Sequence, residues 1–185
     1  MATSVSRTVL AVSLLLSAAV ASAGETPPPA YQLIALPAGV PSEVLYSIAL
    51  QESGIRLRGQ LVPWPWTLNV AGNGYRFANR SDACGALLHA LRTAGSHRID
   101  VGLGQTNLGA NGHRYSSPCE GLEPHKNLSV TAQILAEHKS KGGDWITAAG
   151  RYHRPAGGEP AARYRRAFTK HLNRVIGTTL MVNNP

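Results

Sequence analysis

The chain has 185 residues, of which 43% are hydrophobic and 15% are charged, and its formal net charge is +8. This length fits one domain, and beyond the first 23 residues no apolar stretch is long enough to span a bilayer, which excludes a protein with several membrane spans. The charge favours an anionic partner, but no nucleic-acid recognition motif is present, so cell-wall polymers and membrane surfaces are expected rather than nucleic acid.

The first 23 residues have the three parts of a signal peptide. Arg7 supplies the positive start, residues 9–20 are apolar and uncharged, and Ala21-Ser22-Ala23 is a small-x-small cleavage site. We expect export to the periplasm and cleavage after Ala23, with no transmembrane segment left in the mature chain. The net charge then falls to +7, because Arg7 is lost. An uncleaved N-terminal anchor is the alternative.

The mature chain is expected to begin with a flexible lead-in over residues 24–40, which are rich in proline and small residues. A single domain should follow over residues 41–178, and residues 179–185 should form a C-terminal tail. Within the domain, the first predicted helix covers residues 42–53. Ser42 is its expected N-cap, and Gly54 is expected to end it in the left-handed conformation.

The rest of the domain is predicted to combine one hairpin with further helices. Aromatic and β-branched residues on both sides of Ala71-Gly72-Asn73-Gly74 predict the hairpin. Residues 99–109 are dense in glycine, and residues 111–126 are expected to form a loop. Helices are predicted, in chain order, over residues 81–94, capped by Ser81, and over residues 128–141, 144–152 and 159–176. Together these elements predict a mainly helical α+β domain.

One carboxylate stands out on the first predicted helix. Leu45, Ile48 and Ala49 have the spacing of a buried helix face, and Glu52 continues the same stripe. An acid at such a position is either a buried ion-pair partner or a proton donor whose pKa is raised by desolvation. Asp100 is a second possible catalytic carboxylate, although a turn or capping role would also explain it.

The other acidic residues and the cysteines have simpler explanations. Glu137 precedes Lys141 by four residues, which favours an ion pair on one helix face. Cys84 and Cys119 lack the spacing of a zinc or redox motif, and in an exported chain they predict a disulfide, with two free buried cysteines as the alternative. The last predicted helix has an apolar stripe that includes Tyr164, which we interpret as packing.

Several other chemistries are absent from the sequence. It contains no His-Glu-x-x-His pair for zinc, no Gly-x-Ser-x-Gly nucleophile elbow and no phosphate-loop lysine. We therefore expect no metal and no organic cofactor.

Three motifs in order resemble the soluble lytic transglycosylases. They are Gln51-Glu52-Ser53-Gly54, Gly102-Leu103-Gly104-Gln105-Thr106-Asn107 and Ala148-Ala149-Gly150-Arg151-Tyr152-His153. The resemblance covers residues 41–168. Two positions depart from the family pattern: Gly104 stands where the family often has Met, and His153 follows Tyr152 where the family has Asn. More narrowly, residues 63–70 resemble an insert of the transglycosylases associated with conjugation and type IV secretion.

The resemblance implies a lysozyme-like fold with the hairpin beside a cleft, and cleavage of the bond between N-acetylmuramic acid and N-acetylglucosamine in peptidoglycan. Glu52 would protonate the leaving oxygen, the substrate's own 2-acetamido group would stabilise the anomeric carbon, and Glu52 would then accept a proton from the sugar's 6-hydroxyl. A 1,6-anhydro ring would result. The implied partners are glycan strands and proteins of a secretion or conjugation apparatus.

The resemblance also implies a set of substrate-binding residues around Glu52. Ser53, Gln105 and Tyr152 would orient the acetamido groups or Glu52 itself, and Asn107 and His153 are further candidates. Each has a structural alternative: Tyr152 could be a core aromatic, and Gln105 and Asn107 could satisfy backbone groups in a turn.

The two tryptophans of the insert have two possible positions. Trp64 and Trp66 could stack on sugar rings in the cleft, or they could pack the hairpin onto the helices. Two alternatives to the implied function also remain, a hydrolytic muramidase and a non-catalytic peptidoglycan-binding subunit of a secretion system.

Overall fold

The computed structural model describes residues 24–177. The predicted signal peptide (residues 1–23) and the predicted tail (residues 179–185) lie outside the described residues. Within residues 24–177 no single helix is long and apolar enough to cross a membrane. The bent pair Pro29–Ala38 and Ser42–Ser53, with 114° between its two helices, passes that test of length and composition only when both helices are taken together.

Helices make up most of the described chain. The α-helices are α1 (Pro29–Ala35), α2 (Ser42–Ser53), α3 (Arg80–Ala94), α4 (Leu108–Asn111), α5 (Pro124–Ser140), α6 (Trp145–His153) and α7 (Gly158–Ile176). Short 3-10 turns are η1 (Leu36–Ala38), η2 (Ser96–Arg98), η3 (Gly112–Arg114) and η4 (Pro118–Leu122). Strands are few and short, so the prediction of a mainly helical α+β fold is confirmed.

The strands form two small antiparallel sheets. One is a hairpin of β1 (Gly54–Leu57) and β2 (Gln60–Pro63), and the other has the order β4-β3-β5-β6. The members of this second sheet are β3 (Thr67–Val70), β4 (Asn73–Arg76), β5 (Ile99–Val101) and β6 (Thr106–Asn107). The predicted hairpin is confirmed as β3–β4, and its turn residues Ala71 and Gly72 both have positive φ.

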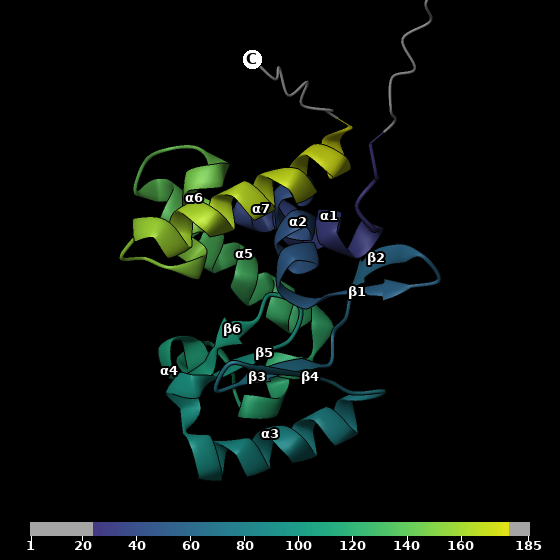
Figure 1. Cartoon of the computed structure of the whole chain (residues 1–185), viewed down its shortest axis with the longest axis vertical. Coiled ribbons are helices and arrows are strands. Elements are labelled where there is room, and N and C mark those ends of the chain that lie inside the picture. Colours follow the sequence, from purple (N-terminus) through teal and green to yellow (C-terminus); the bar gives the residue numbers. More distant parts are fainter. Residues whose placement is uncertain (1–23, 178–185) are drawn as a thin grey trace, which may run out of the picture.

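The larger sheet lies between α3 on one side and α2 and α7 on the other (Figure 1). The buried side chains form two hydrophobic cores. The first core is shared by α1, α2, α5, α6 and α7, and its fully buried side chains include Leu45, Ile48 and Phe168. The second core is shared by the sheet, α3, α4, η4 and α5, and includes Leu68 and Leu87. Tyr152 packs against both cores, so it marks the level at which the helical layer meets the sheet.

The expected flexible lead-in is wrong, because residues 29–38 are helical and packed. Tyr31 and Ala35 are spaced one helical turn apart and are buried in the first core. Tyr31 meets Tyr46 of α2 edge to face, with 4.9 Å between the ring centroids. The folded domain therefore begins before residue 41.

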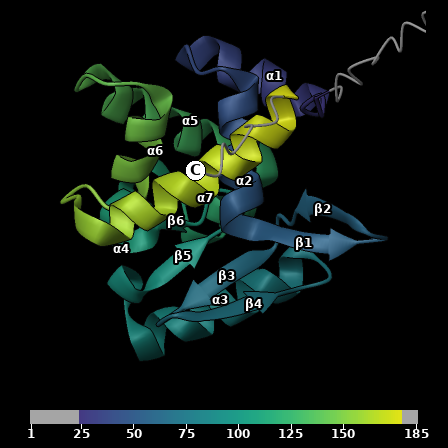
Figure 2. The ribbon, with the colours of Figure 1, turned by 45° about the horizontal axis from the view of Figure 1, so that its top comes forward.

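Gly54 differs from its prediction as well. Its φ of −56° and ψ of 135° are extended rather than left-handed, and it begins strand β1 directly after α2. The β1–β2 hairpin that follows extends outward from the body of the molecule (Figure 2). Arg58 and Gly59 form its turn, both with positive φ, which is the pattern of a tight two-residue hairpin turn.

The predicted helix starts are less accurate than the helices themselves. Asn79, rather than Ser81, caps α3, because its side chain accepts a hydrogen bond from the backbone N–H of Asp82. Ser42 is the first residue of α2 and not its N-cap. Helix α5 begins at Pro124, four residues before its prediction, and Glu123 caps it.

The predicted disulfide between Cys84 and Cys119 is confirmed, with 5.3 Å between the two Cα atoms. It joins α3 to η4, and Arg80 of α3 reinforces the same connection by donating a hydrogen bond to the Cys119 carbonyl. The bond therefore closes the outer side of the second core.

Candidate functional site

A cleft of about 480 Å³ lies where the helical layer meets the larger sheet. Residues from α2, β3, β5, β6, α4, α5 and α6 line it, together with Gln105 and Pro155 from loops. Five of the residues predicted for the site are among them: Glu52, Gln105, Asn107, Tyr152 and His153. Asp100, the second possible catalytic carboxylate, lines the same cleft.

Glu52 projects into this cleft from the last turn of α2. One carboxyl oxygen, Oε1, accepts a hydrogen bond of 2.6 Å from the hydroxyl of Tyr164 on α7. The other oxygen, Oε2, accepts none from residues 24–177, and Glu52 is partly exposed. One oxygen is therefore held in place while the other remains open to a ligand.

The surroundings of Glu52 favour its neutral form. Burial raises the pKa of Glu52 to about 7, the hydrogen bond from Tyr164 opposes part of that rise, and the nearby carboxyl of Asp100 adds to it. A carboxyl group with a pKa near neutral is divided between its acid and its base at neutral pH. Glu52 can therefore both donate and accept a proton.

Tyr164 is a site residue that the sequence analysis missed. It was interpreted as part of an apolar stripe, and its ring is indeed buried in the first core. A buried tyrosine hydroxyl needs a partner, however, and Tyr164 finds it in a residue 112 positions away. The phenol in an otherwise apolar stripe was the available signal, but nothing in the sequence identified its partner.

Ser53 does not bind substrate in this arrangement, so that prediction is wrong. Its side chain is fully buried, and its hydroxyl hydrogen-bonds the carbonyls of Ala49 and Leu103. It thereby fixes the end of α2 to the loop that precedes Gln105. Ser53 positions the two walls of the cleft relative to each other.

Gly104 is required by the packing beneath this loop. A Cβ atom at this position would lie 2.0 Å from Thr131 Oγ1. The carbonyl of Gly104 also accepts a hydrogen bond of 2.5 Å from the Tyr152 hydroxyl. A Met side chain, which the transglycosylases that the sequence resembles often have here, would not fit, since Thr131 occupies the space that it would need.

Gln105 lines the cleft, as predicted, and its side chain also satisfies backbone groups of a turn, which was the structural alternative. Its φ is +48°, an uncommon conformation for a residue with a side chain. Its amide nitrogen donates to the carbonyls of Thr67 and Gly102, which fixes the orientation of the amide. Its amide oxygen accepts no hydrogen bond from residues 24–177, so it is available to an N–H group in the cleft.

Asn107 acts on the site through Asp100. Its amide nitrogen donates to Asp100 Oδ1 at 2.9 Å and to the carbonyl of His97, while its amide oxygen caps α4 by accepting from Ala110 N–H. Burial raises the pKa of Asp100, and the hydrogen bond from Asn107 and the nearby His153 oppose that rise. The cleft thus contains two carboxyl groups with raised pKa values.

His153 stacks on Tyr164, with parallel rings and centroids 4.5 Å apart. The side chain is exposed and lines the cleft, so it covers the aromatic ring whose hydroxyl holds Glu52.

Trp64 and Trp66 do not line the cleft, so their predicted role in sugar stacking is not supported there. Trp64 donates a hydrogen bond of 2.8 Å to the carbonyl of Phe77, which ties together the two ends of the β3–β4 hairpin. Trp66 packs against the second core and meets Trp64 edge to face. Trp66 therefore agrees with the alternative, in which the tryptophans pack the hairpin onto the core, and Trp64 holds the ends of the hairpin together.

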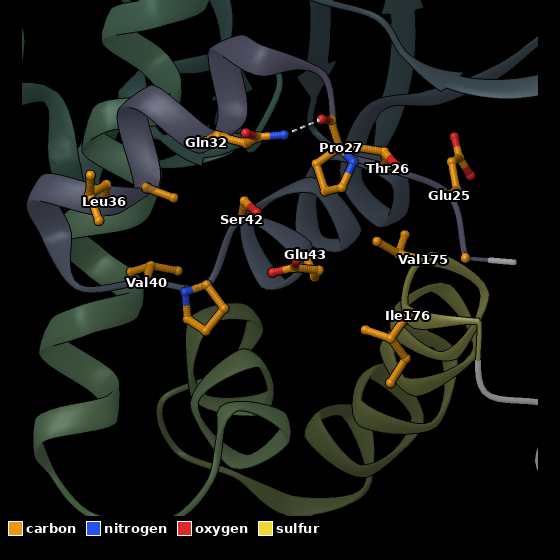
Figure 3. Close-up of a pocket in the computed structure, with 13 residues that line it drawn as sticks. Glu25, Thr26, Pro27, Gln32, Leu36, Val40, Ser42, Glu43, Val175 and Ile176 are labelled. Atoms are coloured by element: carbon orange, nitrogen blue, oxygen red, sulfur yellow. Dashed lines mark hydrogen bonds between the residues drawn. The ribbon is translucent and has the colours of Figure 1, made fainter.

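A larger hollow of about 720 Å³ lies elsewhere, between residues 24–27, the start of α2 and the end of α7 (Figure 3). Its two carboxylates have structural roles. Glu25 accepts hydrogen bonds from Tyr46 and Arg174, and Glu43 lies in the first turn of α2, where a negative charge is stabilising. Among residues 24–177, this hollow therefore contains no carboxylate that is arranged for acid–base chemistry.

Among residues 24–177 no group of three His, Cys, Asp or Glu side chains could hold a metal ion. Comparisons with protein-family models, with curated proteins and with solved structures find no match to this chain.

Proposed function

We propose that the protein is a peptidoglycan lytic transglycosylase that acts through Glu52. The observation that carries the proposal is the environment and the raised pKa of the Glu52 carboxyl group. It lies in a cleft, one of its oxygens is held by Tyr164, and burial raises its pKa to about 7. A single residue that must first donate and then accept a proton works best with a pKa near the working pH.

In the first step, the Glu52 carboxyl gives its proton to the glycosidic oxygen, and the bond between that oxygen and the anomeric carbon breaks. The substrate's acetamido oxygen bonds to the anomeric carbon and takes up the positive charge. In the second step, the Glu52 carboxylate takes the proton of the 6-hydroxyl, whose oxygen displaces the acetamido oxygen and closes the 1,6-anhydro ring. The amide oxygen of Gln105 is available to accept the acetamido N–H.

The mode of cleavage is tested by digesting purified peptidoglycan and analysing the muropeptides by mass spectrometry. A lytic transglycosylase yields products with 1,6-anhydro ends, which are lighter by one water than the products of hydrolysis. Products with reducing ends only would reject the proposal in favour of a hydrolase. No release of muropeptides at all would favour a non-catalytic peptidoglycan-binding subunit.

A hydrolytic muramidase is the second candidate function, and Asp100 is the observation that favours it. Most glycosidases use two carboxyl groups, and Asp100 lines the same cleft as Glu52, close enough for its charge to raise the pKa of Glu52. In a hydrolase, Asp100 would activate a water or attack the anomeric carbon.

Asp100→Asn is expected to separate the two mechanisms. A transglycosylase should keep most of its activity, whereas a hydrolase that uses Asp100 should lose about 10²–10⁴-fold in kcat. Because the charge of Asp100 raises the pKa of Glu52, its removal should also move the high-pH limb of the activity profile to lower pH. Rates of muropeptide release across a pH series measure both effects.

Tyr164→Phe is expected to move the same limb in the opposite direction. The hydroxyl of Tyr164 lowers the pKa of Glu52, so its removal should raise that pKa and keep Glu52 protonated at higher pH. Loss of a hydrogen bond to a charged group should also reduce kcat about tenfold. Tyr75→Phe, at an exposed tyrosine of β4, is the matched control. An unchanged pH profile for Tyr164→Phe would contradict the assigned role.

We also propose a biological setting, which rests on the resemblance of residues 63–70 to an insert of secretion-associated transglycosylases. An exported transglycosylase that resembles those of conjugation and type IV secretion would open the peptidoglycan locally for such an apparatus. Its partners would be the glycan strands and proteins of that apparatus in the periplasm.

A further inference from the structure

The lining of the cleft includes a ring nitrogen without a hydrogen-bond partner in the described residues. His138 of α5 lines the cleft and is only 9% exposed, and its Nδ1 atom is enclosed by protein without a hydrogen-bond partner among residues 24–177. The other ring nitrogen, Nε2, is not enclosed in this way and also has no partner in the described residues. Nothing in the mechanism proposed for Glu52 uses this histidine.

The surroundings of His138 determine which hydrogen it presents. Burial lowers the pKa of His138, and the positive charges of Lys141 and Arg151 lower it further while Glu137 opposes them, so the ring is neutral at neutral pH. Among backbone groups, a buried N–H without an acceptor is rarer than a buried carbonyl without a donor, and we apply the same preference to the enclosed Nδ1 atom. The proton therefore belongs on Nε2, which makes His138 a neutral hydrogen-bond donor.

The neighbouring residues supply complementary contacts without a net charge. Glu137 does not pair with Lys141 as predicted. Instead, both of its carboxylate oxygens accept hydrogen bonds of 2.8 Å from Arg114, whose positive charge balances that of Glu137. The side-chain amide of Asn111 makes no hydrogen bond within residues 24–177, so it is free to bind a ligand. Ala110, Ile134 and Pro155 add apolar surface to the lining of the same cleft.

We propose that Asn111, Ile134 and His138 form a subsite for an N-acetyl group of the glycan strand. His138 Nε2–H donates to the acetyl carbonyl, the Asn111 amide oxygen accepts the acetamido N–H, and the apolar residues contact the methyl group. This inference rests on the glycan-cleaving function proposed above. It adds a second point of recognition, separate from Glu52, that selects acetylated sugars over plain hexoses.

Binding without turnover tests the subsite. The Glu52→Gln protein is titrated by calorimetry with tetra-N-acetylchitotetraose and with cellotetraose, in which a hydroxyl replaces each acetamido group. Adding His138→Leu should weaken binding of the acetylated tetramer about tenfold, the value of one hydrogen bond, and leave cellotetraose binding unchanged. His138→Gln, which retains a donor, should lose less. His125→Leu, at an exposed histidine in the first turn of α5, is the matched control.

Asn111→Ala provides a second, surface-accessible variant that does not depend on the packing around His138, and it should show the same selective loss. Equal weakening of both tetramers, unchanged affinity, or no binding of the acetylated tetramer overturns the subsite. The proposed function is judged separately, by muropeptide release from the protein with Glu52 intact. Release of anhydro products with a KM that is unaffected by His138→Leu would reject the subsite and retain the function. Selective binding of the acetylated tetramer without any cleavage of peptidoglycan would retain the subsite and reject the proposed function.

Discussion

Replacing Glu52 with glutamine is expected to abolish glycan cleavage while the fold stays intact. The amide keeps the size of the carboxyl group and can still accept a hydrogen bond from Tyr164, but it can neither donate the required proton nor take one back. Loss of general acid–base catalysis costs about 10²–10⁴ in rate, and we expect the upper end because the same group acts in both steps. Release of anhydro-muropeptides by the variant at near the parent rate would disprove catalysis by Glu52.

The stability of the Glu52→Gln variant provides an independent check. The pKa of Glu52 is about 7 in the folded protein, above its usual value of 4.5 in an unfolded chain. The unfolded chain therefore loses its proton first as pH rises, so ionisation of Glu52 favours unfolding between these two values and above. Glutamine has no such ionisation. The variant should melt at the same temperature as the parent near pH 4 and at a higher temperature near pH 8.

Removing the disulfide should have the largest effect on stability. The bond between Cys84 and Cys119 joins positions 35 residues apart, and the chain-entropy relation for a loop of that length gives about 4 kcal/mol. We expect the double variant Cys84→Ser, Cys119→Ser to lose about 3–4 kcal/mol in the free energy of unfolding, measured with denaturant.

A reducing agent offers the matched control for this variant. It should destabilise the parent by a similar amount and leave the double variant unchanged, because that variant has no disulfide to reduce. A loss below about 1 kcal/mol would contradict this prediction. It would mean that residual structure already restricts the unfolded chain without the bond.

The sequence predicted the elements of this fold better than their ends. Helix α2 and its stripe of Leu45, Ile48 and Ala49 could be predicted because local periodicity determines them. Helix α1 was missed because its prolines suggested a lead-in, although one proline occupies the first turn, where it is tolerated. The β1–β2 hairpin was missed because a glycine after a helix often ends it in the left-handed conformation, whereas Gly54 is extended and begins a strand.

In the candidate site, likewise, some features could be predicted from the sequence and others could not. Glu52, Gln105 and Tyr152 come together as predicted, since their motifs place them on elements that meet at the cleft. The directions of other side chains depend on tertiary contacts that no local pattern specifies. Ser53 adjoins Glu52 in sequence yet turns inward to Leu103, whereas Tyr164 is distant in sequence and supplies the direct contact.

The link between Tyr164 and Glu52 has a consequence for how the protein matures. Glu52 lies in the first third of the chain, and the helix that carries its partner is the last one in the described residues. Ribosomes and export channels both deliver a chain from its N-terminus, so Glu52 emerges long before α7 does. An incompletely delivered chain lacks the hydroxyl that holds its acid in place, and its cleft remains unfinished. If Glu52 cleaves glycan strands as proposed, the order of delivery would withhold that cleavage until the chain has emerged as far as α7.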